Sequence, residues 1–270
     1  MIDKIEGILI SKIPYQEKHL IGKLILRNGK KATIIFYGGR GSLKSKASYL
    51  ELGHMVDVVL VPYKKDPMMV KSKEWSLIWA SKRVRSSINL FFLLCFYMEV
   101  VDKIAPSHDF EDEDYSDLSS EGIFRVLSNA LYFLENREGP KEQNELGQMT
   151  LFLGKLLLHQ GLFPTRDICC FCGEFLHQKR NLSLVPDHGG FSCALCFDNS
   201  ERRGLESEQL GRMMHCILGE ISIKKYKDFS FQKDFNITLS QSLFHYFCYQ
   251  YQLLPKGFKS LKHLGRKASF

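Results

Sequence analysis

Two closely spaced pairs of cysteines constrain the fold of this chain more than any other feature of its sequence. The chain contains two Cys-x2-Cys motifs that are separated by 20 residues, Cys169 with Cys172 and Cys193 with Cys196. Each pair can chelate one ion from a tight turn, and a loop of this length can bring four thiolates together around a tetrahedral Zn²⁺. Gly173 follows the first pair, where such a turn requires a positive φ. The spacing therefore predicts one zinc ion per chain, held in a zinc element at residues 168–197.

We expect this zinc to be structural. Four thiolates complete the coordination shell and leave no position for water or substrate. Cys170 is left out of the ligand set, because only the spacing of Cys169 and Cys172 is repeated in the second pair. Disulfides are the alternative use of these cysteines. However, residues 1–6 lack the apolar core of a signal peptide, and eight cysteines in 270 residues is a low density for a disulfide scaffold. We therefore expect reduced thiols and a cytoplasmic location.

Positive charge is concentrated toward the two ends of the chain, whose formal net charge is +7. Residues 1–85 contain 17 Lys and Arg against 7 Asp and Glu, whereas residues 109–121 are acidic. After Asp234 there is no acidic residue, and the basic residues there are Lys256, Lys259, Lys262, Arg266 and Lys267. Segregated basic segments indicate a polyanionic partner, with nucleic acid the first choice and ordinary solubilising charge the alternative.

The first 80 residues have the pattern of a small β-barrel. Apolar, β-rich runs occupy residues 5–10, 20–26, 32–37, 55–61 and 68–75. Asn28-Gly29 separates the second run from the third and predicts a two-residue hairpin turn, since both residues tolerate positive φ. About five short strands in such a length predict a closed barrel, an OB-fold in preference to an SH3-like one.

The remainder of the chain has a helical pattern. One helix is predicted to end at Ile104, with Ser87 or Asn89 as its N-cap, and the others at residues 120–135, 143–159, 206–218 and 240–254. We therefore predict an α+β protein with an OB-fold barrel at residues 1–80 and an all-α domain at residues 81–270, into which the zinc element is inserted. The longest apolar stretch, residues 88–98, is too short to span a bilayer.

The sequence lacks the motifs of the common catalytic sites that we considered. In the glycine-rich loop at residues 38–46, Leu43 stands where a P-loop requires glycine, and Lys44 stands where a dinucleotide motif requires one. The motifs of zinc deaminases, zinc proteases and serine hydrolases are also absent. We therefore expect a protein that is not an enzyme. The basic loop suits phosphate contacts through its backbone amides together with Arg40, Lys44 and Lys46.

Several motifs, taken in their order along the chain, resemble the bacterial RecO family. The segments that carry the resemblance are Ile5–Ile10, Tyr15–Lys18, Asn28–Lys30, Gly38–Arg40 with Lys44 and Lys46, Gly161–Pro164, the four zinc-spaced cysteines with Gly189-Gly190, and Lys259–Lys262. The resemblance spans nearly the whole chain. It implies an N-terminal OB-fold followed by a helical domain with an inserted zinc element.

The resemblance also implies a function, that of a non-enzymatic recombination mediator in DNA repair. Such a protein binds single- and double-stranded DNA and anneals complementary strands that are coated by single-strand-binding protein. It contacts the C-terminal tail of that protein, and with RecR it helps to load RecA. The implied location is the bacterial cytoplasm, in association with the nucleoid. The alternative function is that of a zinc-ribbon or OB-fold transcription factor or RNA-binding factor without annealing activity.

Annealing brings two polyanions together, so it requires cationic surfaces that offset phosphate repulsion. We expect one DNA-binding surface on the barrel, formed by Arg40, Lys44 and Lys46 with the adjoining Lys23, Lys30 and Lys31. A second surface is expected near the C-terminus, formed by Lys262, Arg266 and Lys267. Aromatic residues lie among the basic residues of the barrel, and any that face outward would suit base stacking; they are Tyr15, Phe36, Tyr37, Tyr49 and Tyr63.

Overall fold

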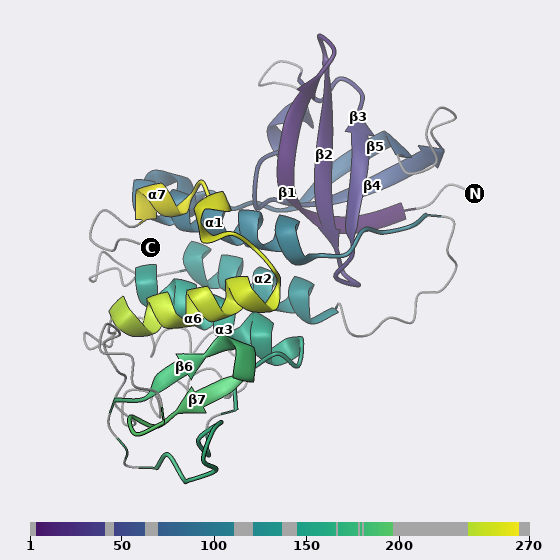
Figure 1. Ribbon diagram of the computed structural model, residues 1–270. Coiled ribbons are helices and arrows are strands. Elements are labelled where there is room, and N and C mark those ends of the chain that lie inside the picture. Colours follow the sequence, from purple (N-terminus) through teal and green to yellow (C-terminus); the bar gives the residue numbers. More distant parts are fainter. Residues whose placement is uncertain are drawn as a thin grey trace. The chain divides into compact units, whose positions relative to one another are not determined.

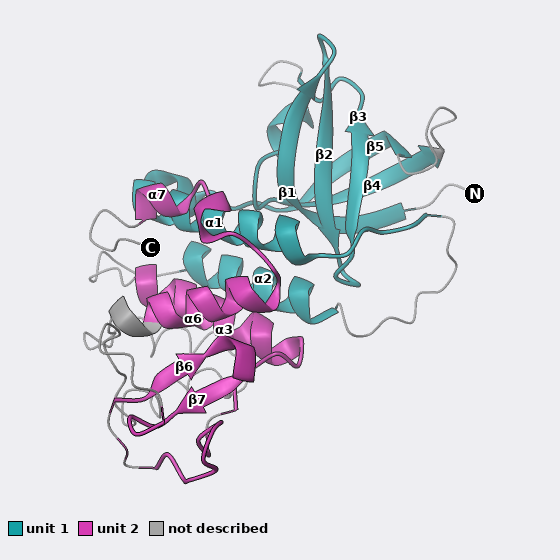
Figure 2. Cartoon of the chain, in the orientation of Figure 1, with its two compact units in different colours: residues 1–137 teal, residues 138–270 magenta. Residues whose placement is uncertain are grey.

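The computed structural model divides the chain into two compact units, residues 1–137 and residues 138–270 (Figure 2). The structure describes residues 4–40, 46–62, 70–110, 121–136, 145–165, 167–177, 179, 181–196 and 237–264. Among the described residues, the first unit contains the predicted barrel and the helices α1 (Ile88–Ile104) and α2 (Glu121–Glu135) (Figure 1). The second unit contains the cysteine pairs and further helices. The predicted change from strands to helices near residue 80 coincides with the end of the last barrel strand. The division into domains at that point stays a prediction.

Five strands in the first unit close into a barrel. They are β1 (Lys4–Tyr15), β2 (His19–Leu26), β3 (Lys31–Phe36), β4 (Met55–Pro62) and β5 (Val70–Trp79). The strand order is β1-β2-β3-β5-β4, and β4 pairs with β1 to close the barrel. Only β3 and β5 run parallel to each other. The architecture fits the predicted OB-fold, and each predicted strand is present, although β1 and β5 extend beyond the predicted ends.

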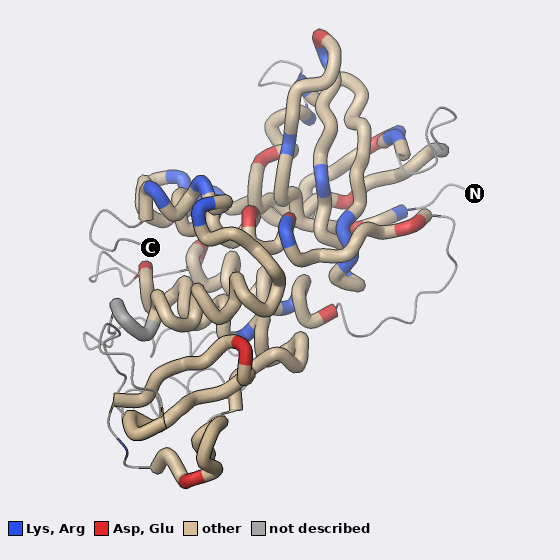
Figure 3. Tube along the Cα trace, viewed as in Figure 1, with Lys and Arg blue, Asp and Glu red and all other residues tan. Residues whose placement is uncertain are grey.

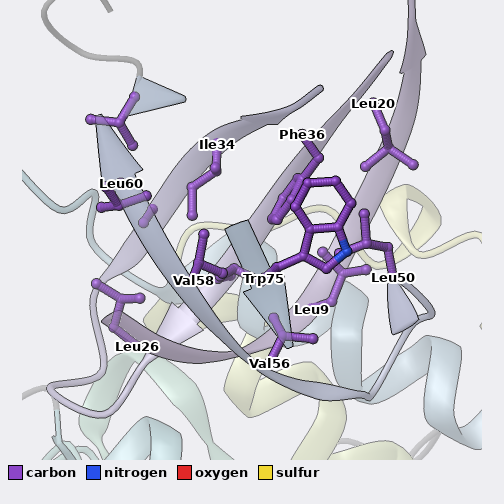
Figure 4. Packing of buried hydrophobic residues seen from close by; sticks show 13 residues of the cluster. Leu9, Leu20, Leu26, Ile34, Phe36, Leu50, Val56, Val58, Leu60 and Trp75 are labelled. Carbon is purple, nitrogen blue, oxygen red and sulfur yellow. The ribbon is translucent and has the colours of Figure 1, made fainter. Parts of the chain in front are cut away.

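The barrel is filled by the inward-facing side chains of all five strands (Figure 4). Phe36 and Trp75 meet edge to face, with ring centroids 5.5 Å apart. Full burial of one large apolar side chain stabilises a fold by about 1.5–3 kcal/mol. The indole Nε1 of Trp75 donates to the carbonyl of Lys46, 2.9 Å away, and so satisfies its buried N–H group. This bond anchors the short helix η1 (Lys46–Tyr49) to the barrel.

Two α-helices complete the part of the first unit that the structure describes. They are α1 (Ile88–Ile104), which Ser87 precedes at the N-cap position, and α2 (Glu121–Glu135). The carboxylate of Glu135 accepts the backbone N–H groups of Lys82, Arg83 and Val84, at the start of the short helix η2 (Arg83–Ser86). Those N–H groups have no partner within their own helix, and a carboxylate is a favourable one. The end of α2 is thereby tied to the segment that leads into α1.

The second unit packs two long helices together with a small hairpin. Its elements are α3 (Glu145–His159), β6 (Ser183–Val185), η3 (Pro186–His188), β7 (Gly190–Ser192), α6 (Ile237–Gln250), η4 (Pro255–Gly257) and α7 (Leu261–Leu264). In the buried contact between α3 and α6, the hydroxyl groups of Thr150 and Ser240 are hydrogen-bonded to each other, 2.8 Å apart. The helix predicted at residues 206–218 lies outside the described residues. None of the described helices is long and apolar enough to cross a membrane.

Candidate metal centre and nucleic-acid interface

The four cysteines of the two Cys-x2-Cys motifs come together in the second unit. The sulfur atoms of Cys169, Cys172, Cys193 and Cys196 all lie within 4.8 Å of one another. The sulfurs of Cys172 and Cys193 are 3.9 Å apart. In a tetrahedral Zn²⁺ site with Zn–S bonds of about 2.3 Å, the sulfurs are about 3.8 Å apart. The cluster therefore has the size and donor set of a site that can hold a metal ion, formed by the four predicted residues.

Backbone hydrogen bonds shape the turns that carry the thiols. Gly173 donates to the carbonyl of Cys169 at 3.0 Å, and its φ of 74° is the left-handed conformation expected at this position. Cys169 in turn donates to Glu174 at 2.8 Å, which closes the first turn. In the second motif, Cys196 donates to the carbonyl of Cys193 at 3.2 Å. The two short motifs thus form compact turns whose thiols converge.

A small hairpin brings the two motifs together. Strand β7 ends at Ser192, so the second motif begins directly after it. The N–H group of Cys170 donates to the carbonyl of Phe191 at 2.9 Å, which joins the first motif to the same strand. Phe191 donates in turn to Thr165 at 3.1 Å. The residues between the motifs therefore act as a scaffold, and Cys170 contributes its backbone to it while its thiol stays outside the cluster.

The environment of the four thiols favours ionisation of one of them. Burial acts to raise the pKa of Cys169, but the backbone N–H groups of Cys172, Cys193 and Phe171 outweigh it and lower that pKa to about 6. The pKa of Cys196 is raised to about 12, because its thiol hydrogen-bonds to those of Cys172 and Cys193. Packed thiols resist joint ionisation, whereas a bound divalent cation stabilises all four as thiolates. A closed shell of four sulfurs supplies stability rather than catalysis.

Two of the lysines predicted to bind DNA are paired within the first unit. The ammonium of Lys23 lies 2.9 Å from both carboxylate oxygens of Asp102 in α1. The ammonium of Lys31 lies 3.1 Å from one of these oxygens and donates to the Asp102 carbonyl at 2.5 Å. Burial acts to raise the pKa of Asp102, but the two lysines outweigh it and lower that pKa. The role of Lys23 and Lys31 at DNA stays a prediction.

The other predicted DNA contacts are distributed over both units. Arg40 is exposed in the turn after β3, Lys46 is exposed at the start of η1, and Lys30 is half-buried in the turn between β2 and β3. Lys262 is exposed on α7. Lys44, Arg266 and Lys267 lie outside the described residues. Arg40 and Lys46 are therefore the described barrel residues that best fit the predicted phosphate contacts.

Three ion pairs within the barrel engage part of its positive charge, which Figure 3 shows along the strands. The pairs are Lys4 with Asp57 at 3.0 Å, Lys12 with Glu51 at 2.8 Å and Arg27 with Glu6 at 2.6 Å. Each pair joins residues far apart in the sequence, so a count of charges along the chain could not indicate them. Pairing reduces the number of basic side chains that can reach a phosphate without giving up another partner.

One exposed aromatic residue lies among basic side chains at an end of the barrel. Tyr37 is 40% exposed, whereas Phe36 beside it is fully buried. Tyr15 and Tyr49 are partly buried, and Tyr63 lies outside the described residues. Side chains alternate in direction along a strand, so the inward position of Phe36 turns Tyr37 outward. From the sequence, Tyr37 was one of five aromatic residues that would suit base stacking if they faced outward. Among those that the structure describes, Tyr37 is the exposed one.

Comparison with known proteins relates the chain to proteins of DNA repair. No family model matches the chain. It is 22% identical over 218 residues to the DNA repair protein RecO of Exiguobacterium sibiricum, covering 80% of this chain and 78% of that protein. It is 23% identical over 203 residues to the DNA repair protein RecO of Bacillus cytotoxicus, covering 75% of this chain and 72% of that protein. These matches support the resemblance that the sequence motifs indicated.

Proposed function

We propose that this chain is a member of the RecO family and that it acts in DNA repair as a non-enzymatic recombination mediator. In this role it binds single- and double-stranded DNA and anneals complementary strands coated by single-strand-binding protein. With RecR it helps to load RecA. The observation that carries the proposal is the similarity to two DNA repair proteins RecO over at least 75% of the chain. The closed barrel and the cysteine cluster agree with it.

The mechanism follows from the charge of the two strands. Annealing is opposed by phosphate repulsion, which bound cationic side chains reduce as they replace counterions. Arg40 and Lys46 on the barrel, with Lys44, would hold one strand. Lys262, with Arg266 and Lys267, would hold the other. Contacts of this kind position a strand without reading its sequence, as an annealing protein requires.

The metal in this proposal is one Zn²⁺, bound by the four clustered cysteines. It stabilises the turns and the hairpin of the second unit and takes no part in chemistry. Thiolate ligands agree with a reducing compartment, so we expect the protein to act in the bacterial cytoplasm, associated with the nucleoid. The expected protein partners are RecR and the C-terminal tail of single-strand-binding protein, with RecA reached indirectly.

Annealing of coated strands is the test of the proposal. Complementary fluorescent oligonucleotides are first coated with single-strand-binding protein and then mixed with or without this protein. We expect annealing to accelerate, and the acceleration to decrease as salt rises, because phosphate contacts are salt-dependent. Measurable DNA binding without acceleration would reject the mediator role in favour of a transcription or RNA-binding factor.

A further inference from the structure

An aromatic ring with basic neighbours is built into one end of the barrel. Tyr37 follows β3 directly and is 40% exposed. Lys71 lies on β5, which pairs with β3, and its ammonium stands 5.2 Å from the centre of the Tyr37 ring. Such a distance is that of a cation–π contact. A cation therefore lies beside the ring of a residue that is exposed to solvent.

A second ring supports Tyr37. The imidazole of His19, at the start of β2, lies with its centroid 4.4 Å from that of Tyr37, at an angle of 49°. The Nδ1 atom of His19 accepts the backbone N–H group of Gly38 at 3.1 Å. The hydrogen bond orients the imidazole, and the imidazole limits the movement of the phenol ring. Tyr37 is therefore supported, rather than a loose surface side chain.

The two glycines after Tyr37 shape the turn beneath the ring. Gly38 has a φ of 75°, which other residues adopt only with strain. A side chain at position 39 would place its Cβ 3.1 Å from the Cβ atoms of both Leu20 and Phe36. These glycines, which belong to the glycine-rich loop noted in the sequence, allow the chain to turn tightly against the barrel.

The same turn presents further positive charge. The backbone N–H group of Arg40 donates to the carbonyl of Lys18 at 3.1 Å, and its guanidinium donates to the carbonyl of Gln16 at 3.4 Å. These bonds tie the turn after β3 to the turn between β1 and β2. Both Lys18 and Arg40 are exposed. The supported ring of Tyr37 thus lies in a region that also contains Lys18, Arg40 and Lys71.

We propose that Tyr37 is a stacking platform for an unpaired base of single-stranded DNA, with Arg40 and Lys71 at the flanking phosphates. The inference rests on the proposed function and adds a site to it. Every base has a π-face, so stacking of this kind tolerates any sequence. The faces of the bases in a duplex are already covered by their neighbours. The platform therefore favours single strands, whereas phosphate contacts serve both forms of DNA.

The test compares oligonucleotides with and without bases. Fluorescence anisotropy measures the binding of three DNAs, which are a fluorescent single strand, an abasic strand of equal length and a duplex. Each DNA is tested with the wild type, with Tyr37→Ala and with Tyr37→Phe. Loss of one stacked base weakens binding by about 5- to 150-fold. We expect this loss for Tyr37→Ala on the strand with bases only, with the abasic strand and the duplex unaffected. Tyr37→Phe keeps the ring and should bind like the wild type.

An exposed tyrosine elsewhere in the first unit provides a matched control. Tyr132 on α2 is 45% exposed, so Tyr132→Ala removes a similar ring and should leave DNA binding unchanged. Thermal unfolding establishes that each variant is folded. Equal affinity of Tyr37→Ala and the wild type for the strand with bases would overturn the stacking site. An equal loss on the abasic strand would also overturn it. Absence of DNA binding by the wild type would instead refute the proposed function.

Discussion

Lys23 in β2 and Asp102 in α1 form an ion pair in which the lysine ammonium lies 2.9 Å from each carboxylate oxygen. Lys31 of β3 reaches the same carboxylate at 3.1 Å. One acidic residue of the helix thus partners two basic residues of neighbouring barrel strands. The arrangement ties α1 to the barrel within the first unit, and it engages two lysines that were expected to contact DNA.

Replacement of Asp102 by asparagine should destabilise the first unit. A hydrogen bond to a charged group contributes about 1.5–3 kcal/mol when buried, and partial exposure of these side chains reduces the contribution to about 1 kcal/mol. We expect a decrease of about 1 kcal/mol or more in the free energy of unfolding at pH 7, measured by urea denaturation. No decrease would show that solvation of the ions offsets their attraction.

The effect of this replacement should depend on pH. The pKa of Asp102 is lower in the folded protein than its ordinary value of 3.8. Its contribution to stability is therefore fully present above pH 3.8 and is lost as the pH falls through the lower, folded pKa. Urea denaturation at a series of pH values should show the curves of the wild type and Asp102→Asn converging in acid. A constant difference between them would contradict this assignment.

Asp102→Asn should also strengthen DNA binding. The substitution releases Lys23 and Lys31 from an internal competitor of phosphate. If both then contact DNA, the slope of log affinity against log salt steepens by up to about two. Salt titrations of binding measure the slope, and Glu121→Gln, which removes an exposed acid from α2, is the control for net charge. An Asp102→Asn slope equal to that of the control would restrict Lys23 and Lys31 to a structural role.

Loss of one cysteine ligand should remove the metal. We expect about one zinc ion per chain in the wild type, measured by elemental analysis, and little in Cys172→Ser. Cys170→Ser is the matched control, because its thiol is adjacent in sequence but lies outside the cluster. The second unit of Cys172→Ser should unfold at lower temperature, since metal binding contributes to folding. Equal zinc loss in both variants would reject the assigned ligand set.

Removal of the two exposed basic residues on the barrel should weaken DNA binding without changing sequence preference. In Arg40→Ala/Lys46→Ala, two predicted phosphate contacts are lost, so the salt slope should decrease by about two. The control is Lys179→Ala, in the second unit, where the lysine pairs with Glu174 at 3.0 Å. A double variant with an unchanged slope would exclude these residues from the DNA surface.

The features that could be predicted from the sequence are those encoded by neighbouring residues. The four clustered cysteines were identifiable because each pair lies within one turn, so the spacing itself determines whether two thiols can chelate one ion. The strands could be recognised from apolar runs and from the turn at Asn28-Gly29. Helix α1 was predicted to its last residue, Ile104, since Pro106 follows soon after. These signals operate over a few residues and depend little on the rest of the fold.

The partners of individual side chains depended on closure of the barrel and on packing of the helices. Lys23 and Asp102 are 79 residues apart in sequence, and no local pattern relates them. Tyr37 meets His19 and Lys71 because β3 lies between β2 and β5 in the barrel. Alternation along a strand shows which residues share a face, but the register between strands decides which side chains meet across it. The four thiols could be assigned from spacing, whereas the aromatic and ionic contacts required the folded chain.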